Sequence, residues 1–153
     1  GIHASTAFAR QPQIKAAVTI VAGAPVASVI ASSDEETLQK YRQLRMKEFS
    51  FKNEVQYGEA LGELITWDPL NFITDDFSRP SLAFVAEGDQ LVETRFQKRL
   101  AQKLGSKTYI ASHGQSWAPF LSTHLWSIGR TWFSHSDKIL EFFKSQLTEP
   151  LNE

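Results

Sequence analysis

The pattern of apolar and polar positions predicts three buried strands separated by helices. Nearly continuous apolar runs cover residues 14–22, 81–87 and 107–111. Runs of this length without polar alternation are typical of strands that are buried on both faces, as in parallel sheets. The runs end in Gly23, in Gly88 and in Ser112-His113-Gly114, which mark turns.

The segments around these strands carry helical signals. Ser33 and Asp34 form a plausible N-cap for a polar helix, and Ser136 does so for the last helix. The order of elements is typical of an α/β protein with a parallel sheet and flanking helices, in one domain of residues 1–153. The predicted helices cover residues 3–10, 34–46, 49–65, 96–104 and 137–147, and the aromatic segment 117–133 is expected to be helical in part.

The composition excludes several classes of function. With 42% hydrophobic residues, 22% charged residues and a net charge of −1, the chain has no general attraction for nucleic acid or anionic membranes. It contains no apolar run of about 18 residues that would span a bilayer. The absence of cysteine excludes disulfides and thiolate nucleophiles and leaves the redox compartment undecided, and a cytoplasmic location is expected. The histidines lack metal-ligand spacing and no Gly-rich phosphate loop is present, so we expect no metal, cofactor or nucleotide.

Candidate chemistry lies where two of the predicted strands end. Asp89 follows the second strand and His113 follows the third. Because ligands bind at the carboxyl ends of parallel strands, these two side chains are expected near one site. A histidine base for acyl transfer needs a carboxylate that fixes its tautomer and stabilises the imidazolium. Asp89 and His113 are therefore predicted to be an acid and base pair.

This stretch resembles the α/β-hydrolase superfamily. Asp68-Pro69 and residues 79–92 (RPSLAFVAEGDQLV) look like the region around the acid strand of that fold. The superfamily places its catalytic residues in the order Ser, acid, His, which Asp89 and His113 follow. Glu87-Gly88-Asp89, together with residues 14–25, is similar to the fermentation–respiration switch protein family of α/β-hydrolase-like proteins.

The start of the chain also resembles this fold. Residues 1–18 look like the helix after a nucleophile elbow followed by the next strand. The resemblance implies that the chain is the C-terminal part of an α/β-hydrolase fold. The nucleophile would lie about two or three residues before Gly1. Residues 33–76 stand where such proteins carry lid or cap helices. Lacking the early strands, the first strand would expose an unpaired edge, so a second chain or copy is expected to complete the sheet.

The resemblance implies a serine hydrolase, esterase-like or thioesterase-like, acting on a small ester or acyl substrate. His113 would take the proton of the nucleophile, Asp89 would orient His113, and Trp117 would line the acyl pocket. His135 is the rival base, whereas His124 is expected to be a packing residue of an aromatic segment.

Other interpretations stay open. One alternative is that Asp89 serves only as a helix cap. Two alternatives for the whole chain are a non-catalytic hydrolase-like scaffold that binds a ligand or partner, and an unrelated doubly wound domain. Ser5 is a poor nucleophile candidate, because no elbow surrounds it.

Overall fold

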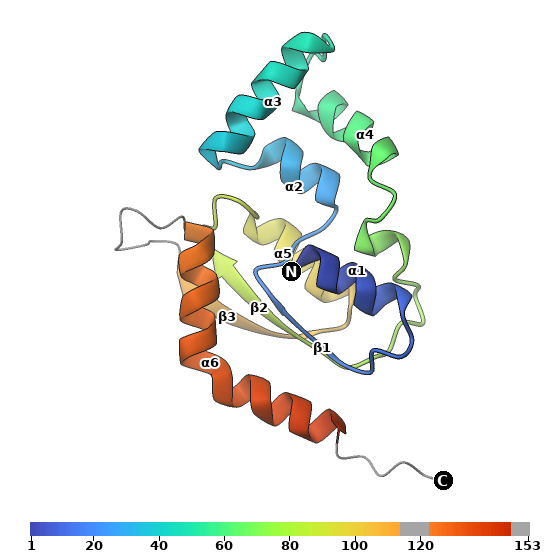
Figure 1. Ribbon diagram of the computed structural model, residues 1–153, viewed down its shortest axis with the longest axis vertical. Helices are drawn as coiled ribbons and strands as arrows, with labels where there is room; N and C mark the ends of the chain where they lie inside the picture. The colour runs from blue at the N-terminus through green and yellow to red at the C-terminus, as the bar shows by residue number, and fades with distance from the viewer. Residues whose placement is uncertain (114–122, 148–153) are drawn as a thin grey trace.

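A computed structural model describes residues 1–113 and 123–147, apart from the side chains of Ser112, His113 and Leu147. Its centre is a parallel sheet of three strands, in the order β1, β2, β3 (Figure 1). The strands are β1 (Ala17–Ile20), β2 (Ser81–Glu87) and β3 (Lys107–His113). The parallel sheet with flanking helices confirms the predicted α/β class.

Helices cover both faces of the sheet. On one face, Leu82 and Phe84 of β2 pack against Ile139 of the last helix. On the other, Phe8 of the first helix packs with Leu100 of the helix between β2 and β3. The helices are α1 (Ile2–Arg10), α2 (Val26–Ser32), α3 (Glu36–Glu48), α4 (Glu54–Leu64), the 3-10 helix η1 (Pro69–Asn71), α5 (Thr94–Lys103) and α6 (Thr123–Leu147).

Several predicted features differ from the structure. The N-cap of α3 is Glu35, whose side chain accepts from the N–H of Leu38, and not Ser33 or Asp34. β1 is shorter than residues 14–22, because the chain turns away from β2 after Ile20. α2 is a helix that the pattern does not indicate, since its seven residues are almost all small or apolar and show no amphipathic period. α6 begins at Thr123, so Ser136 lies inside a helix and is not its cap. The polar residues around Ser136 cost a helix only tenths of a kcal/mol each, about the difference between Ser and Ala.

A buried arginine holds together the helical insertion, which we define as residues 26–71 between β1 and β2. Arg42 of α3 donates to the carbonyl oxygens of Ala31 at 2.8 Å and Ser33 at 3.1 Å. These carbonyls belong to the last turn of α2, where a helix has no internal donors left. Arg42 also pairs with Glu54 of α4 at 3.0 Å. One side chain therefore connects three helices of the insertion.

A buried carboxylate joins the two ends of the same insertion. Asp68, which is 6% exposed, accepts a hydrogen bond from the N–H of Val26 at the start of α2. Its other oxygen accepts from the N–H of Leu70 at 2.9 Å in η1. Charge-assisted bonds of this kind are roughly twice as strong as neutral ones. The first and last residues of the insertion therefore lie next to each other, joined by the side chain of Asp68.

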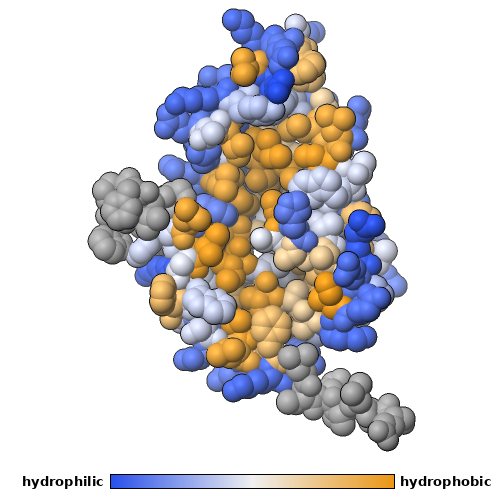
Figure 2. Space-filling model, in the orientation of Figure 1, coloured by the Kyte–Doolittle hydropathy of each residue, from blue (hydrophilic) through white to orange (hydrophobic). Residues whose placement is uncertain are grey.

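The outer edge of β1 is open in the described part of the chain, where β1 pairs with β2 alone. Figure 2 shows a band of apolar residues on this face, running from α2 down between α6 and α1. An unpaired strand edge beside apolar surface favours the addition of a further strand. That a second chain or copy completes the sheet stays a prediction.

A side-chain amide fills the gap where β1 and β2 diverge. The N–H of Val21 donates to the carbonyl of Phe84 at 2.9 Å, and the left-handed φ of Val21, +49°, then turns the chain away. Ala86 lies two residues beyond Phe84 and therefore presents its N–H and carbonyl to the same side of β2. Gln97 of α5 accepts from that N–H at 2.8 Å and donates to that carbonyl at 3.1 Å. It also donates to the carbonyl of Val92 at 2.6 Å.

Gln97 thus replaces a strand residue at the carboxyl end of β2. Its side chain is buried, with only 1% of the residue exposed, so water has no access to these backbone groups. Buried backbone groups without partners are rare in native proteins because each costs free energy comparable to a lost hydrogen bond. Gln97 therefore fixes α5, β2 and the loop between them relative to one another.

We expect Gln97→Leu to lower the free energy of unfolding by about 2–4 kcal/mol, because it leaves buried backbone groups of Ala86 and Val92 without their amide partner. Urea denaturation measures the loss. Gln102→Leu, at an exposed position of the same helix, is the matched control and should change stability by at most about 0.5 kcal/mol. Equal effects of the two substitutions would contradict this role of Gln97.

Candidate functional site

The loop after β2 places a buried carboxylate at the carboxyl edge of the sheet. β2 ends at Glu87, and Gly88 turns the chain with a φ of +74°, a left-handed conformation that glycine adopts without strain. Asp89 follows and is 4% exposed. Its Oδ1 accepts from the N–H groups of Leu91 at 3.0 Å and Val92 at 2.8 Å. These bonds orient the carboxylate and leave Oδ2 available to a further donor.

That further donor is His124, in the first turn of α6. Its Nδ1 lies 3.1 Å from Oδ2 and 3.2 Å from Oδ1 of Asp89. The carboxylate side chain is fully buried, and the imidazole is 18% exposed. Because an ionised carboxylate can only accept, Nδ1 must carry the proton in this contact. In the neutral ring Nε2 is then an acceptor, which is the form that a general base needs.

The sequence prediction found Asp89 but assigned His124 to packing. The structure instead brings His124 into contact with Asp89. A correct prediction of where α6 begins would have identified His124 as a candidate. The prediction of a last helix from residue 137, with segment 117–133 helical only in part, leaves the position of His124 undefined, whereas a helix from Thr123 puts it in the first turn.

The other predicted histidines have different positions. His113 is the last residue of β3, where its backbone pairs in register with Glu87 of β2. This puts the Cα of His113 at the same edge as Asp89, but its side chain lies outside the described residues, as does the whole of Trp117. His135 stacks on Phe84 at 5.2 Å between ring centroids, on the α6-covered face of the sheet. Its role as rival base finds no support in that position.

The amino end of α1 stands at the same edge of the sheet. A Cβ on Gly1 would lie 3.0 Å from the Cβ of Ala22 and 3.5 Å from the carbonyl oxygen of Ile20. Gly1 therefore lies close to the end of β1, and a side chain at this position would require Ala22 to shift by a few tenths of an ångström. The positive end of the α1 dipole and its free N–H groups face this edge, where they favour negative charge.

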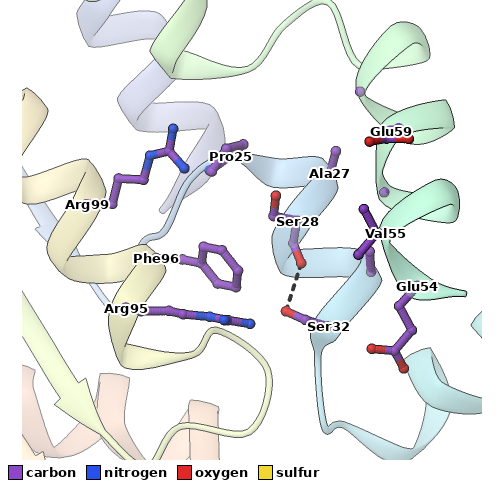
Figure 3. Close-up of a pocket in the computed structure, with 13 residues that line it drawn as sticks. Pro25, Ala27, Ser28, Ser32, Glu54, Val55, Glu59, Arg95, Phe96 and Arg99 are labelled. Carbon is purple, nitrogen blue, oxygen red and sulfur yellow. Dashed lines mark hydrogen bonds between the residues drawn. The ribbon is translucent and has the colours of Figure 1, made fainter.

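A groove lies between α2, α4 and α5. Figure 3 shows Arg95, Phe96 and Arg99 of α5 on one side of this groove, with α2 and α4 on the other. Its volume is about 660 Å³. Arg95 pairs with Glu93 at 2.9 Å, and Glu93 also accepts from the hydroxyl of Ser32 in α2. The groove is not lined by Asp89 or His124, so it is distinct from the acid and histidine pair.

A smaller apolar cleft of about 340 Å³ lies within the insertion, between α3 and α4. Phe51 and Tyr57 meet there with ring centroids 5.9 Å apart. Burial raises the pKa of the Tyr57 hydroxyl. The cleft supplies apolar surface but no pair of groups for acid–base chemistry.

Other classes of site lack support among residues 1–113 and 123–147. Within these ranges no cluster of three or more His, Asp or Glu residues has the arrangement that would hold a metal ion. No helix in the same ranges is both long and apolar enough to cross a bilayer. Comparison of the chain with protein-family models, with curated proteins and with solved structures finds no match. Function is therefore argued from the Asp89–His124 pair and its surroundings.

We expect Asp89→Asn to invert the tautomer of His124. The amide oxygen would keep the bonds from Leu91 and Val92, which turns the NH₂ group toward Nδ1 and makes Nδ1 an acceptor. Two-bond ¹H–¹⁵N NMR spectra of the ring should then change from the Nδ1–H to the Nε2–H pattern. Asp137→Asn, on the exposed surface of α6, is the control. An unchanged Nδ1–H pattern in Asp89→Asn would contradict the contact.

Proposed function

We propose that the chain carries the acid and base of a serine hydrolase of the α/β-hydrolase type, acting on a small ester or thioester. The observation that carries the proposal is the contact of the His124 Nδ1 with the buried carboxylate of Asp89. The pair lies where parallel strands end, which is the edge at which open α/β sheets bind ligands. A histidine that bears its proton on the carboxylate side has its other nitrogen free to accept one.

The nucleophile in this proposal is a serine about two or three residues before Gly1, near the amino end of α1. His124 Nε2 takes the proton of the serine hydroxyl while its oxygen attacks the carbonyl carbon of the ester. The resulting imidazolium then gives this proton to the leaving alcohol or thiol as the ester bond breaks. Water, deprotonated by the same nitrogen, releases the acid from the acyl-enzyme. Asp89 holds the ring and stabilises its charge in both steps.

Two features of the carboxyl edge support this placement. The close approach of Gly1 to Ala22 brings the amino end of α1 to the end of β1. Backbone N–H groups at that end would stabilise the negative charge that forms on the carbonyl oxygen. The order of the strands and of Asp89 and His124 along the chain also follows the order acid, then histidine, of this superfamily.

His124 takes the role first predicted for His113. The distance of 3.1 Å between the His124 Nδ1 and Oδ2 of Asp89 favours His124, and it is the residue we assign as base. His113 as base, Trp117 as part of the acyl pocket and residues 33–76 as a lid stay predictions.

The alternative function is a non-catalytic scaffold. Asp89 already accepts two backbone N–H groups of its own loop, and such a carboxylate can serve structure alone. In that case the contact with His124 would only fasten α6 to the loop. A scaffold of this kind would bind a ligand or partner without turnover.

Activity of the full-length protein tests the proposal. We expect His124→Ala to lower kcat/KM for a chromogenic ester by about 10³-fold or more, by analogy with other triad knockouts. His135→Ala, in which the ring lost lies against Phe84, should retain activity. A fluorophosphonate probe should label one serine at the elbow in the wild type, and much more slowly in His124→Ala.

Each possible failure has a distinct meaning. If His113→Ala loses esterase activity while His124→Ala keeps full activity, His113 is the base and not His124. The absence of both hydrolysis and labelling in the wild type would reject the hydrolase and leave the scaffold.

A further inference from the structure

Two adjacent peptide groups, on either side of the Cα of Gln90, link the helical insertion to the acid and histidine pair. The carbonyl of Gln90, the residue after Asp89, accepts from the Ser33 hydroxyl at 3.0 Å and from the Asp34 N–H at 2.9 Å. On its other side, the N–H of Gln90 donates to the Thr123 hydroxyl at 3.3 Å. Thr123 is the residue before His124. Gln90 therefore contacts both the end of α2 and the start of α6.

The orientation of this peptide group determines the position of the carboxylate. The carbonyl of Gln90 and the N–H of Leu91 belong to the same planar amide. That N–H donates to Oδ1 of Asp89 at 3.0 Å. A donor on the carbonyl fixes the plane and polarises the amide, which strengthens the bond that its N–H makes to the carboxylate. A hydroxyl outside the site thus acts on Asp89 through one amide.

We propose that Ser33 is a positioning residue for the Asp89–His124 pair and that the helical insertion is coupled to the site through the amide of Gln90 and Leu91. That this coupling contributes to catalysis rests on the function proposed above. The contacts themselves do not depend on that function.

The surroundings of Ser33 suit this role. Ser33 is 0% exposed, so its hydroxyl has no competing water. Arg42 holds the carbonyl of the same residue at 3.1 Å, which fixes the backbone that carries the hydroxyl. The neighbouring Ser32 makes its side-chain contact to Glu93 and lines the groove of Figure 3. Ser32 is therefore a matched control, one residue away and on the same helix.

The test compares Ser33→Ala with Ser32→Ala in the full-length protein. With Ser33→Ala we expect kcat to fall by about 10-fold or more, because small displacements of a catalytic pair reduce rate strongly. KM should stay within about twofold, since a loss confined to the reacting groups does not weaken ground-state binding. The Nδ1–H population of His124, read by two-bond ¹H–¹⁵N NMR, should fall in parallel. Ser32→Ala should change neither quantity.

A second pair of variants keeps the test valid if Ser33→Ala does not fold. Thr123→Val removes the acceptor of the Gln90 N–H, in the Asp89–Gln90 amide next to the one that Ser33 contacts, and should reproduce both effects because the two amides share the Cα of Gln90. Thr123→Ser keeps the hydroxyl and should restore wild-type values, which a purely structural role of the methyl group would not.

The outcomes separate this inference from the proposed function. A protein without esterase activity in which Ser33→Ala still lowers the Nδ1–H population would reject the hydrolase and support the coupling. An active protein in which Ser33→Ala and Thr123→Val leave both kcat and the tautomer as in the wild type would overturn the coupling alone. A fall in stability shared equally by Ser33→Ala and Ser32→Ala, with the His124 tautomer unchanged, would overturn it as well.

Discussion

The carboxyl edge of the sheet depends on the hydrogen bonds that the side-chain amide of Gln97 makes to the backbone of Ala86 and Val92. At Val21 the chain leaves β2 in a left-handed conformation that β-branched residues rarely adopt and that costs about 1–3 kcal/mol. Burial of Val21 at 2% exposed, against Val92 and Phe96, holds the chain there. Without Gln97, the departure would leave the Ala86 N–H unsatisfied, while the Ala86 carbonyl would keep the bond from the Thr94 hydroxyl. Gln97 of α5 thus makes the hydrogen bonds to β2 that β1 no longer makes beyond Val21.

Three elements meet on the short loop between β2 and α5, and each holds a different part of it. α5 holds Val92 through Gln97, α2 holds Gln90 through Ser33, and α6 holds Asp89 through His124. The contact of Gln97 with Val92 is local, whereas the contacts of Ser33 and His124 join residues 57 and 35 positions apart in the chain. The acid and histidine pair is therefore a product of tertiary packing, and its geometry follows from helices on both faces of the sheet.

The features predicted best from the sequence are those that neighbouring residues in the chain determine. β2 has its predicted bounds because a buried apolar run between Pro80 and Gly88 has few other conformations. Asp89 was found because its place after that strand defines its role. α2 was missed, and the start of α6 was not defined within the segment 117–133 that was expected to be helical in part, since their residues show no clear amphipathic period and tertiary packing determines their conformation. His124 was missed for the same reason. Its partner is 35 residues away, and no local pattern reports that distance.

The carboxylate of Asp68 has a consequence for how such a chain can change. Because it joins Val26 to the far end of the insertion, the distance between the two points of departure does not depend on what lies between them. Loop-closure entropy grows only slowly with length, by about 0.6 kcal/mol for each doubling. Helices could be added to or exchanged within α3 and α4 with less effect on the sheet than within α2, whose Val29 packs with Val21 and Ala86. The outer part of the insertion is thus a replaceable module, which can change while α2 and the parallel strands stay the same.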